Sequence, residues 1–359
     1  MTFTPTRRAV LASGAATIAA HAFNGPALGA TTPVRYAGVN IAGGEFGKLP
    51  GKFAKDYAYP SRTSLQYFSG QGFNLVRIPF RWERLQPTLN ADLDAEELKR
   101  LQATVNAATA LQLTVVLDTH NYAKRRLASD GWKDVHVIGS DAVPSAAFAD
   151  FCGRLAAAFK DNPSVIFGLM NEPTGIVAYE WLPITNGAIA AMRNAGAKQI
   201  ILVPGVNYTG AHSWFSSGND LMAEVVDREH NFVIEVHQYL DRDSSGTTGG
   251  VVGPSIGSDR LQKFQDWARA KEIKAFLGEF GAGRDEQSLA ALKNICAKMQ
   301  ENSDVWMGWA AWSGGDWWPD SYPLNLSPSK DGAARPQVPI LAEQAKQFIH
   351  GNVAEQRRN

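Results

Sequence analysis

The chain has 359 residues, of which 45% are hydrophobic and 19% are charged, with 35 basic and 35 acidic side chains. This composition excludes a disordered chain, which needs low hydrophobicity and high net charge. The neutral balance argues against a nucleic-acid partner, because no excess of Lys and Arg can displace counterions from phosphates. No apolar run reaches the roughly 18 residues of a membrane span, so we expect no membrane partner. The length allows two ordinary domains or one large α/β barrel.

Residues 1–30 are predicted to be a targeting segment. Arg7 and Arg8 form a pair, a weakly apolar stretch follows, and small residues lead to Ala30. The pattern resembles a bacterial twin-arginine (Tat-type) signal peptide. An amphipathic N-terminal helix is the alternative, which the absence of an alternating polar face disfavours. We expect cleavage after Ala30, or else after Ala22, and a mature chain 31–359 that is periplasmic or secreted.

The chain has two cysteines, Cys152 and Cys296, each among apolar residues that repeat at helical spacing. This context is typical of buried positions, so we expect two separate thiols rather than one disulfide. Cys and His show no metal-ligand spacing, and we expect no metal site.

Short apolar runs alternate with longer amphipathic stretches. Several runs are continuously apolar, which is typical of strands buried on both faces of a parallel sheet. The predicted strands are Arg35–Ile41, Asn74–Pro79, Leu113–Thr119, Val165–Met170, Ile200–Pro204, Phe232–His237, Ala275–Gly278 and Val305–Trp312. The predicted helices are Asp94–Leu111, Pro144–Lys160, Ile184–Asn194, Ser258–Lys271, Ser288–Gln300 and Gln337–Ile349. Asp94 and Glu97 give the first of these helices a capping-box pattern.

This alternation repeats every 35–40 residues or so, roughly the rhythm of a (β/α)8 TIM barrel. A doubly wound open sheet also alternates strands and helices, but no Gly-x-Gly-x-x-Gly follows the first strand, and Gly43-Gly44 is a poor substitute. No linker rich in Pro, Gly or Ser divides the chain after residue 30. We therefore predict an α/β fold, a single-domain TIM barrel over residues 31–359.

Polar or aromatic side chains directly follow six of the predicted strands. In a TIM barrel the C-terminal strand ends converge on the face that carries the active site. A carboxylate there costs several kcal/mol unless it has a partner or a water-filled cleft. The strand-end residues are Arg77, Asp118, His120, Asn171, Glu172, His237, Tyr239, Glu279 and Trp312. Their shared position predicts one functional site.

Two of these residues, Glu172 and Glu279, indicate a chemistry. Paired carboxylates in one cleft hydrolyse glycosides, one as proton donor and the other as nucleophile or base. Carboxyl groups about 5–5.5 Å apart retain the anomeric configuration, and groups roughly 6.5–9.5 Å apart invert it. The alternative at both positions is a buried salt bridge.

Six sequence blocks resemble glycoside hydrolase family 5, in the order in which that family carries them. The blocks are Val76-Arg-Ile-Pro79, Asp118-Thr-His-Asn-Tyr122, Phe167-Gly-Leu-Met-Asn-Glu-Pro173, Val236-His-Gln-Tyr-Leu-Asp241, Leu277-Gly-Glu-Phe-Gly281 and Gly308-Trp-Ala-Ala-Trp312. Gly38–Ala42 and His237–Gly246 are similar to the subgroup of fungal and bacterial endo-β-1,4-glucanases. The resemblance spans about Arg35 to Trp318.

The resemblance implies that Glu172 is the general acid/base and Glu279 the nucleophile of a retaining enzyme. It also implies supporting roles: Arg77 and Tyr239 at the nucleophile, Asn171 at the sugar 2-hydroxyl, His120 and His237 along the cleft, and Trp312 stacked under a sugar ring. Each supporting residue has a structural alternative, an ion pair for Arg77 and core packing for His120, His237, Tyr239 and Trp312. Asp118 is expected to orient His120 or Arg77. Asn40 and Asn207 either touch substrate or form turns.

The predicted loops carry further aromatic and basic residues. Trp82, Tyr122, Trp181, Trp214, Trp317 and Trp318 would add sugar subsites where exposed, and we expect about half of them to anchor loops instead. Lys124-Arg125-Arg126 departs from the family pattern. It is either a solvated loop or a cationic site for an anionic polymer.

We therefore expect a monomeric endo-β-1,4-glucanase, a cellulase that acts on β-glucan polysaccharide or cello-oligosaccharide without a metal or organic cofactor. A β-mannanase or another β-glycanase of the same family is the first alternative, because loop contacts to the 2-hydroxyl decide the substrate. A non-catalytic polysaccharide-binding barrel is the second, and the presence of both glutamates disfavours it.

Overall fold

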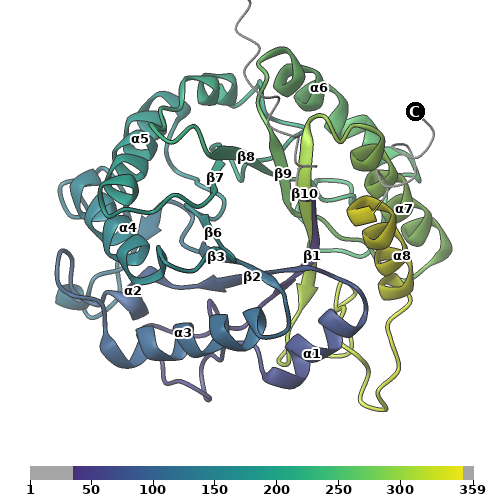
Figure 1. Ribbon diagram of the computed structural model, residues 1–359, viewed down its shortest axis with the longest axis horizontal. Helices are drawn as coiled ribbons and strands as arrows, with labels where there is room; N and C mark the ends of the chain where they lie inside the picture. Colours follow the sequence, from purple (N-terminus) through teal and green to yellow (C-terminus); the bar gives the residue numbers. More distant parts are fainter. Residues whose placement is uncertain (1–34, 351–359) are drawn as a thin grey trace, which may run out of the picture. The chain divides into compact units, whose positions relative to one another are not determined.

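The computed structural model describes residues 35–350. Within this range, eight parallel strands close into a barrel in the order β1-β10-β9-β8-β7-β6-β3-β2 (Figure 1). The barrel strands are β1 (Tyr36–Ile41), β2 (Leu75–Phe80), β3 (Thr114–Thr119), β6 (Val165–Gly168), β7 (Ile201–Pro204), β8 (Phe232–His237), β9 (Ala275–Glu279) and β10 (Trp306–Gly314). The predicted TIM barrel is confirmed. The predicted signal peptide lies outside the described residues.

Helices surround the barrel and cover its outer face (Figure 1). They are α1 (Arg62–Gly70), α2 (Trp82–Leu85), α3 (Ala95–Thr109), α4 (Ser145–Phe159), α5 (Ala178–Asn194), α6 (Ile256–Ala270), α7 (Glu286–Glu301) and α8 (Gln337–His350). Between β3 and α4 lies a small hairpin of β4 (Lys124–Arg125) and β5 (His136–Val137), with the 3-10 turn Ala128–Asp130 between its strands; a second 3-10 segment, Asn219–Glu224, follows β7. No helix in the described range combines the length and apolarity needed to cross a bilayer.

The barrel interior explains how the fold positions a site. Seven strands each contribute one side chain to a small apolar cluster inside the barrel: Leu75, Val116, Ile166, Leu202, Val233, Phe276 and Ala310. Because side chains alternate along a strand, the residue two positions later faces the same interior, nearer the C-terminal end. The residues two positions after Leu75, Val116 and Val233 are Arg77, Asp118 and Glu235, which form the next layer toward the C-terminal end of the barrel. The apolar cluster thus lies beneath a layer of polar side chains, Arg77, Asp118 and Glu235, which we call the polar floor.

The helices largely match the expected ones, with informative differences. Asp94 caps α3, accepting a hydrogen bond from the Glu97 amide at 2.8 Å. The Glu97 carboxylate instead accepts from the hydroxyls of Tyr57 and Tyr59, each at 2.7 Å. Only half of the predicted capping box forms, because burial beside two tyrosines offers Glu97 stronger donors. Helix α5 begins at Ala178 rather than Ile184 and contains Pro183, and α1 was not predicted.

Burial separates the loop aromatics into two groups. Trp82, Trp181 and Trp214 have no exposed surface and belong to the core, so the sugar-subsite interpretation is wrong for them. Trp317 is 40% exposed, and Tyr122 and Trp318 are partly exposed. The local sequence did not distinguish these groups, because an indole at a loop end suits either environment.

Cys152 and Cys296 are free and buried, as expected. Their side chains belong to the main hydrophobic core between the strands and the helices. Burial raises the pKa of both thiols, which keeps them protonated and unreactive.

A buried ion pair joins the end of α5 to the loop before β8. Arg193 donates to both carboxylate oxygens of Asp227, at 2.8 and 2.7 Å, and neither side chain is exposed. We predict that Arg193→Met lowers the free energy of unfolding by about 3–5 kcal/mol, because it leaves a buried carboxylate without its partner. Urea denaturation measures this.

The matched control is Arg154→Met, which removes the pairs of Arg154 with Asp150 and the exposed Asp92. We expect a cost below about 1 kcal/mol there, because water screens these charges. Equal losses in the two variants would contradict the assignment.

Candidate active site

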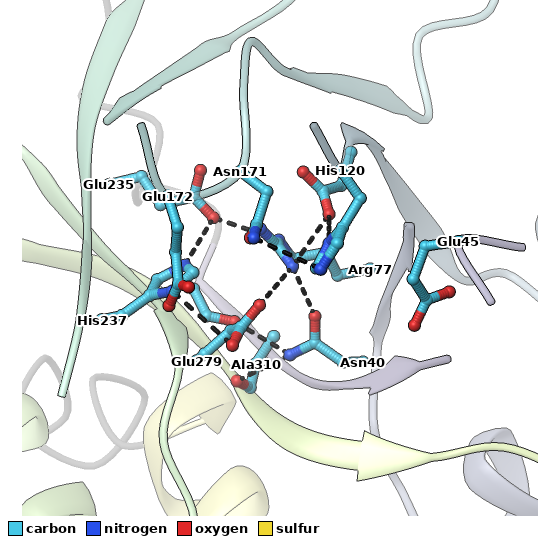
Figure 2. Close-up of polar contacts among 12 residues, drawn as sticks. Asn40, Glu45, Arg77, His120, Asn171, Glu172, Glu235, His237, Glu279 and Ala310 are labelled. Atoms are coloured by element: carbon cyan, nitrogen blue, oxygen red, sulfur yellow. Dashed lines mark hydrogen bonds and ion pairs between the residues drawn. The ribbon is translucent and has the colours of Figure 1, made fainter. Parts of the chain in front are cut away.

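Arg77 lies at the centre of the polar floor, at the C-terminal end of the barrel (Figure 2). Its guanidinium is completely buried. It lies 3.1 Å from Asp118, 3.1 Å from Glu235 and 3.0 Å from Glu279, which come from β3, β8 and β9. Burial alone lowers the pKa of Arg77, but these carboxylates raise it above its ordinary value, so the side chain is a permanent cation.

Arg77 also orients two asparagines. It donates to Asn40 Oδ1 at 2.9 Å and to Asn171 Oδ1 at 2.8 Å. The Asn40 amide in turn donates to the carbonyl of Gly278 at 2.9 Å. Asn40 is therefore part of the floor, which neither of the two predicted roles described.

Gly278 is required here by space. A Cβ at this position would lie 2.1 Å from Glu235 Oε1 and 2.8 Å from His237 Nε2. Because Gly278 has no side chain, Glu235 has room to reach Arg77. Glu235 was missed by the sequence analysis, although a charge inside the apolar run Phe232–His237 was the available signal.

Glu279 is held by two donors. Arg77 Nη1 donates to Oε1 at 3.0 Å and the Tyr239 hydroxyl donates to Oε2 at 2.7 Å. Burial raises the pKa of Glu279 above its ordinary value, while the positive charges of His237 and Arg77 oppose that rise. Burial and the charge of Glu279 also raise the pKa of the Tyr239 hydroxyl, which therefore remains a donor.

Glu172 faces Glu279 across His237 (Figure 2). His237 Nδ1 lies 2.7 Å from Glu172 Oε1 and 3.6 Å from Glu279 Oε2. Burial lowers the pKa of His237, but the surrounding carboxylates, with Glu279 the strongest, raise it to about 10. The Glu172 backbone has φ 43°, an uncommon value for a non-glycine residue that is typical of functional positions.

One atom from each of Glu172, His237 and Glu279 lies within 4.8 Å of the other two. Among the described residues this is the one group of three that could hold a metal ion. The hydrogen bond between His237 and Glu172 accounts for the close approach without an ion.

His120 and Trp312 form another wall of the site. His120 Nδ1 lies 2.7 Å from Asp118 Oδ2, and Nε2 lies 3.3 Å from the Asn171 amide. The Trp312 ring stacks on His120 with centroids 5.9 Å apart and remains partly exposed. Its indole donates to the Tyr322 hydroxyl at 3.0 Å, which fixes the ring orientation. Tyr322 lies in a long loop whose sequence carried no signal for this role.

The nine strand-end residues of the predicted site therefore lie together. Beside them a cleft of about 520 Å³ is lined by Glu172, His237 and Tyr239 together with Asn207, Tyr208 and His212. Asn207 thus reaches the cleft wall and also has a positive φ of 54°. Asp118 contacts both Arg77 and His120, as expected.

Glu45 is a further carboxylate that the sequence analysis did not identify. It lies after β1, on the opposite side of Arg77 from His237 (Figure 2). Its Oε2 accepts from the Gly43 amide at 2.8 Å, and its Oε1 is buried without a hydrogen-bond partner. Burial raises the pKa of Glu45 to about 7, against the opposing charge of His120.

Comparison with known proteins gives the same family as the sequence blocks. Residues 31–315 match the family described as Cellulase (glycosyl hydrolase family 5). Endoglucanase 3 of Humicola insolens is 37% identical over 292 residues, which cover 80% of this chain and 71% of that protein.

Solved structures are also similar. A triple mutant of an endo-β-1,4-glucanase from Xanthomonas axonopodis pv. citri is 44% identical, with a TM-score of 0.84 over 88% of this chain and 100% of that one. XacCel5A in complex with cellopentaose is 44% identical, with a TM-score of 0.83 over 87% of this chain and 99% of that one.

We predict that Glu45→Gln changes the pH dependence of stability. Because the folded-state pKa is raised, the stability that the protonated carboxyl contributes is full below 4.5 and is lost as the pH rises to about 7. Gln cannot ionise and avoids this loss. The variant should match the wild type near pH ~4 and exceed it near pH ~8 by roughly 1–3 kcal/mol in urea denaturation.

The exposed Glu301→Gln serves as the control, with no such pH-dependent gain expected. A constant offset between Glu45→Gln and the wild type across this range would contradict the raised pKa.

Proposed function

The chain belongs to glycosyl hydrolase family 5, and we propose that it is a retaining endo-β-1,4-glucanase with Glu279 as nucleophile and Glu172 as acid/base. The observation that carries the proposal is the approach of these two carboxylates to within 4.8 Å, measured between one oxygen of each. An inverting pair keeps its carboxyl groups roughly 6.5–9.5 Å apart to leave room for a water molecule, so oxygens this close together favour the retaining geometry.

In the first step Glu172 donates a proton to the glycosidic oxygen while Glu279 attacks the anomeric carbon. Arg77 and Tyr239 hold both oxygens of Glu279 and aim the carboxylate at the substrate, and the charge of Arg77 opposes the rise in pKa that burial causes. The glycosidic bond breaks, the leaving sugar takes the proton, and an ester forms between the sugar and Glu279.

In the second step Glu172 takes a proton from water as the water oxygen attacks the anomeric carbon. The ester bond to Glu279 breaks, and Glu279 leaves as a carboxylate. Ester formation has removed the negative charge of Glu279, so Glu172 no longer faces a second carboxylate when it acts as a base. Glu172 is the more accessible carboxylate, with 15% of its side chain exposed against 5% for Glu279. This difference suits a group that exchanges protons with substrate and water.

The remaining residues bind the sugar at the cleavage point. Asn171 would hydrogen-bond the 2-hydroxyl, a contact that strengthens in the oxocarbenium-like transition state. Trp312 would stack under the pyranose, and His120 and His237 would border it. No step requires a metal or an organic cofactor.

The substrate class rests on relatives and on the cleft. Endoglucanase 3 and the two solved structures are named as endoglucanases or bind cellopentaose, which supports a β-1,4-glucan as substrate. Exposed aromatic side chains at the cleft, such as Tyr208 at 53%, suit an open site for a polymer. A β-mannanase would use the same carboxylates and is separated by the substrate panel below.

We further propose export through the twin-arginine signal in residues 1–30, with 31–359 as the catalytic domain, acting as a monomer outside the cytoplasm. The proposal rests on Arg7, Arg8 and the small residues before Ala30.

We predict release of reducing sugar from carboxymethylcellulose and mixed-linkage glucan, and little from mannan or xylan. Glu279→Gln should lower the rate by more than about 10³-fold with folding intact, because an amide cannot form the ester. Colorimetric assay of the four polysaccharides measures both. Activity on mannan alone would overturn the substrate assignment, and near-normal activity of the variant would overturn the nucleophile.

We predict that Glu172→Gln slows hydrolysis of cello-oligosaccharides by about 10²–10⁴-fold, the usual contribution of a general acid. The loss should be far smaller for the bond-breaking step of a dinitrophenyl cellobioside, whose leaving group needs no proton. Burst kinetics separate this step from deglycosylation. Equal losses in the first step with both substrates would count against the acid role.

A further inference from the structure

A second cavity lies beside the cleft and plays no part in the mechanism above. It has a volume of about 340 Å³ and lies next to the β4–β5 hairpin. Tyr122 and Tyr208 line both this cavity and the cleft that contains Glu172. We call it the side pocket. Tyr122 and Tyr208 form a common wall, so the side pocket adjoins the cleft.

The side pocket has an excess of positive charge. Arg81, Lys124, Arg125 and Arg126 line it, and Glu83 is the one carboxylate among its lining residues. The Glu83 carboxylate already accepts hydrogen bonds, from the Asn121 amide at 2.7 Å and the Arg126 backbone at 3.0 Å. It therefore compensates only part of the charge.

Two arginines that line the side pocket have buried donor atoms without a hydrogen-bond acceptor. Arg125 is 1% exposed, and its Nε and Nη1 have no hydrogen-bond partner. Arg81 Nε is also buried and unpartnered. Leaving a buried donor unsatisfied is unfavourable, and a bound acceptor removes that penalty. Burial lowers the pKa of Arg125 to about 10, so it stays cationic at neutral pH.

Lys124 supplies the accessible charge. Within residues 35–350 no hydrogen bond or ion pair engages its ammonium group, and the side chain is partly exposed. Arg126, in contrast, donates to the carbonyls of Trp132 and Lys133 and helps to hold its own loop. Lys124 is therefore the residue whose charge can be removed with the least structural effect.

We propose that the side pocket binds a carboxylate carried as a substituent on a β-1,4-linked glucan. The proposal rests on the proposed function, since Glu172 protonates the leaving group and its side of the cleft then holds the leaving sugar. Arginine forks and a lysine ammonium match a carboxylate in charge and geometry. The cavity is also near the lower end of the size range of small-molecule sites.

Two soluble substrates that differ in charge test the proposal. Carboxymethylcellulose carries carboxylates on a β-1,4-glucan, and hydroxyethylcellulose carries neutral substituents on the same backbone. For Lys124→Gln we expect KM on carboxymethylcellulose to rise about threefold with kcat unchanged, as for the loss of one partly screened ion pair. KM on hydroxyethylcellulose should stay the same. Lys124→Glu should give a larger rise, and added salt should raise the wild-type KM on the anionic substrate only.

Lys133→Gln is the matched control, because Lys133 is exposed in the same loop and does not line the side pocket. It removes the same charge and should leave both KM values unchanged. The proposal is overturned by an unchanged KM for Lys124→Gln on carboxymethylcellulose, by equal rises on the two substrates, or by an equal effect of Lys133→Gln. Wild-type protein that cleaves neither substrate would instead overturn the proposed function, and this inference with it.

Discussion

The buried charge of Arg77 is the constraint on which the site depends. The guanidinium lies within 3.1 Å of carboxylates from β3, β8 and β9, and its side chain has no exposed surface. Removing either partner of such a pair leaves an uncompensated charge, at a cost of about 3–5 kcal/mol. Arg77 therefore ties β2 to strands on both sides of the barrel mouth. The same contacts fix the position of Glu279, so the architecture and the candidate nucleophile share one interaction.

The environments of the two glutamates differ in a way that matches the two proposed roles. Both oxygens of Glu279 receive donors from the barrel floor, whereas Glu172 has its main contact with His237 and is more exposed. A nucleophile benefits from fixed orientation, and an acid/base benefits from access to substrate and water. The side pocket adjoins the cleft that contains Glu172, because Tyr122 and Tyr208 line both cavities.

The barrel and its site could be predicted from two local patterns, the continuous apolar runs and the polar residues at the ends of these runs. Continuous apolar runs indicated buried parallel strands, and parallel strands bring their C-terminal ends together, which placed residues such as Arg77 and Glu279 in one site. The partner of Glu235 could not be predicted: a charge inside an apolar run marks the residue, but only the closed barrel brings it to Arg77. The burial of loop residues could not be predicted from the sequence either. Trp82 and Trp317 have similar sequence contexts, but Trp82 is buried and Trp317 is exposed.

The assignment of Glu279 is tested most directly by trapping the covalent intermediate. A 2-deoxy-2-fluoro cellobioside with a dinitrophenyl leaving group slows both steps but permits the first, so the glycosyl ester accumulates. Intact-mass and peptide analysis should find one fluorocellobiosyl group per chain, attached to the peptide that contains Glu279, and none in Glu279→Gln. An adduct on Glu172, or release of dinitrophenol without any adduct, would contradict the proposed mechanism.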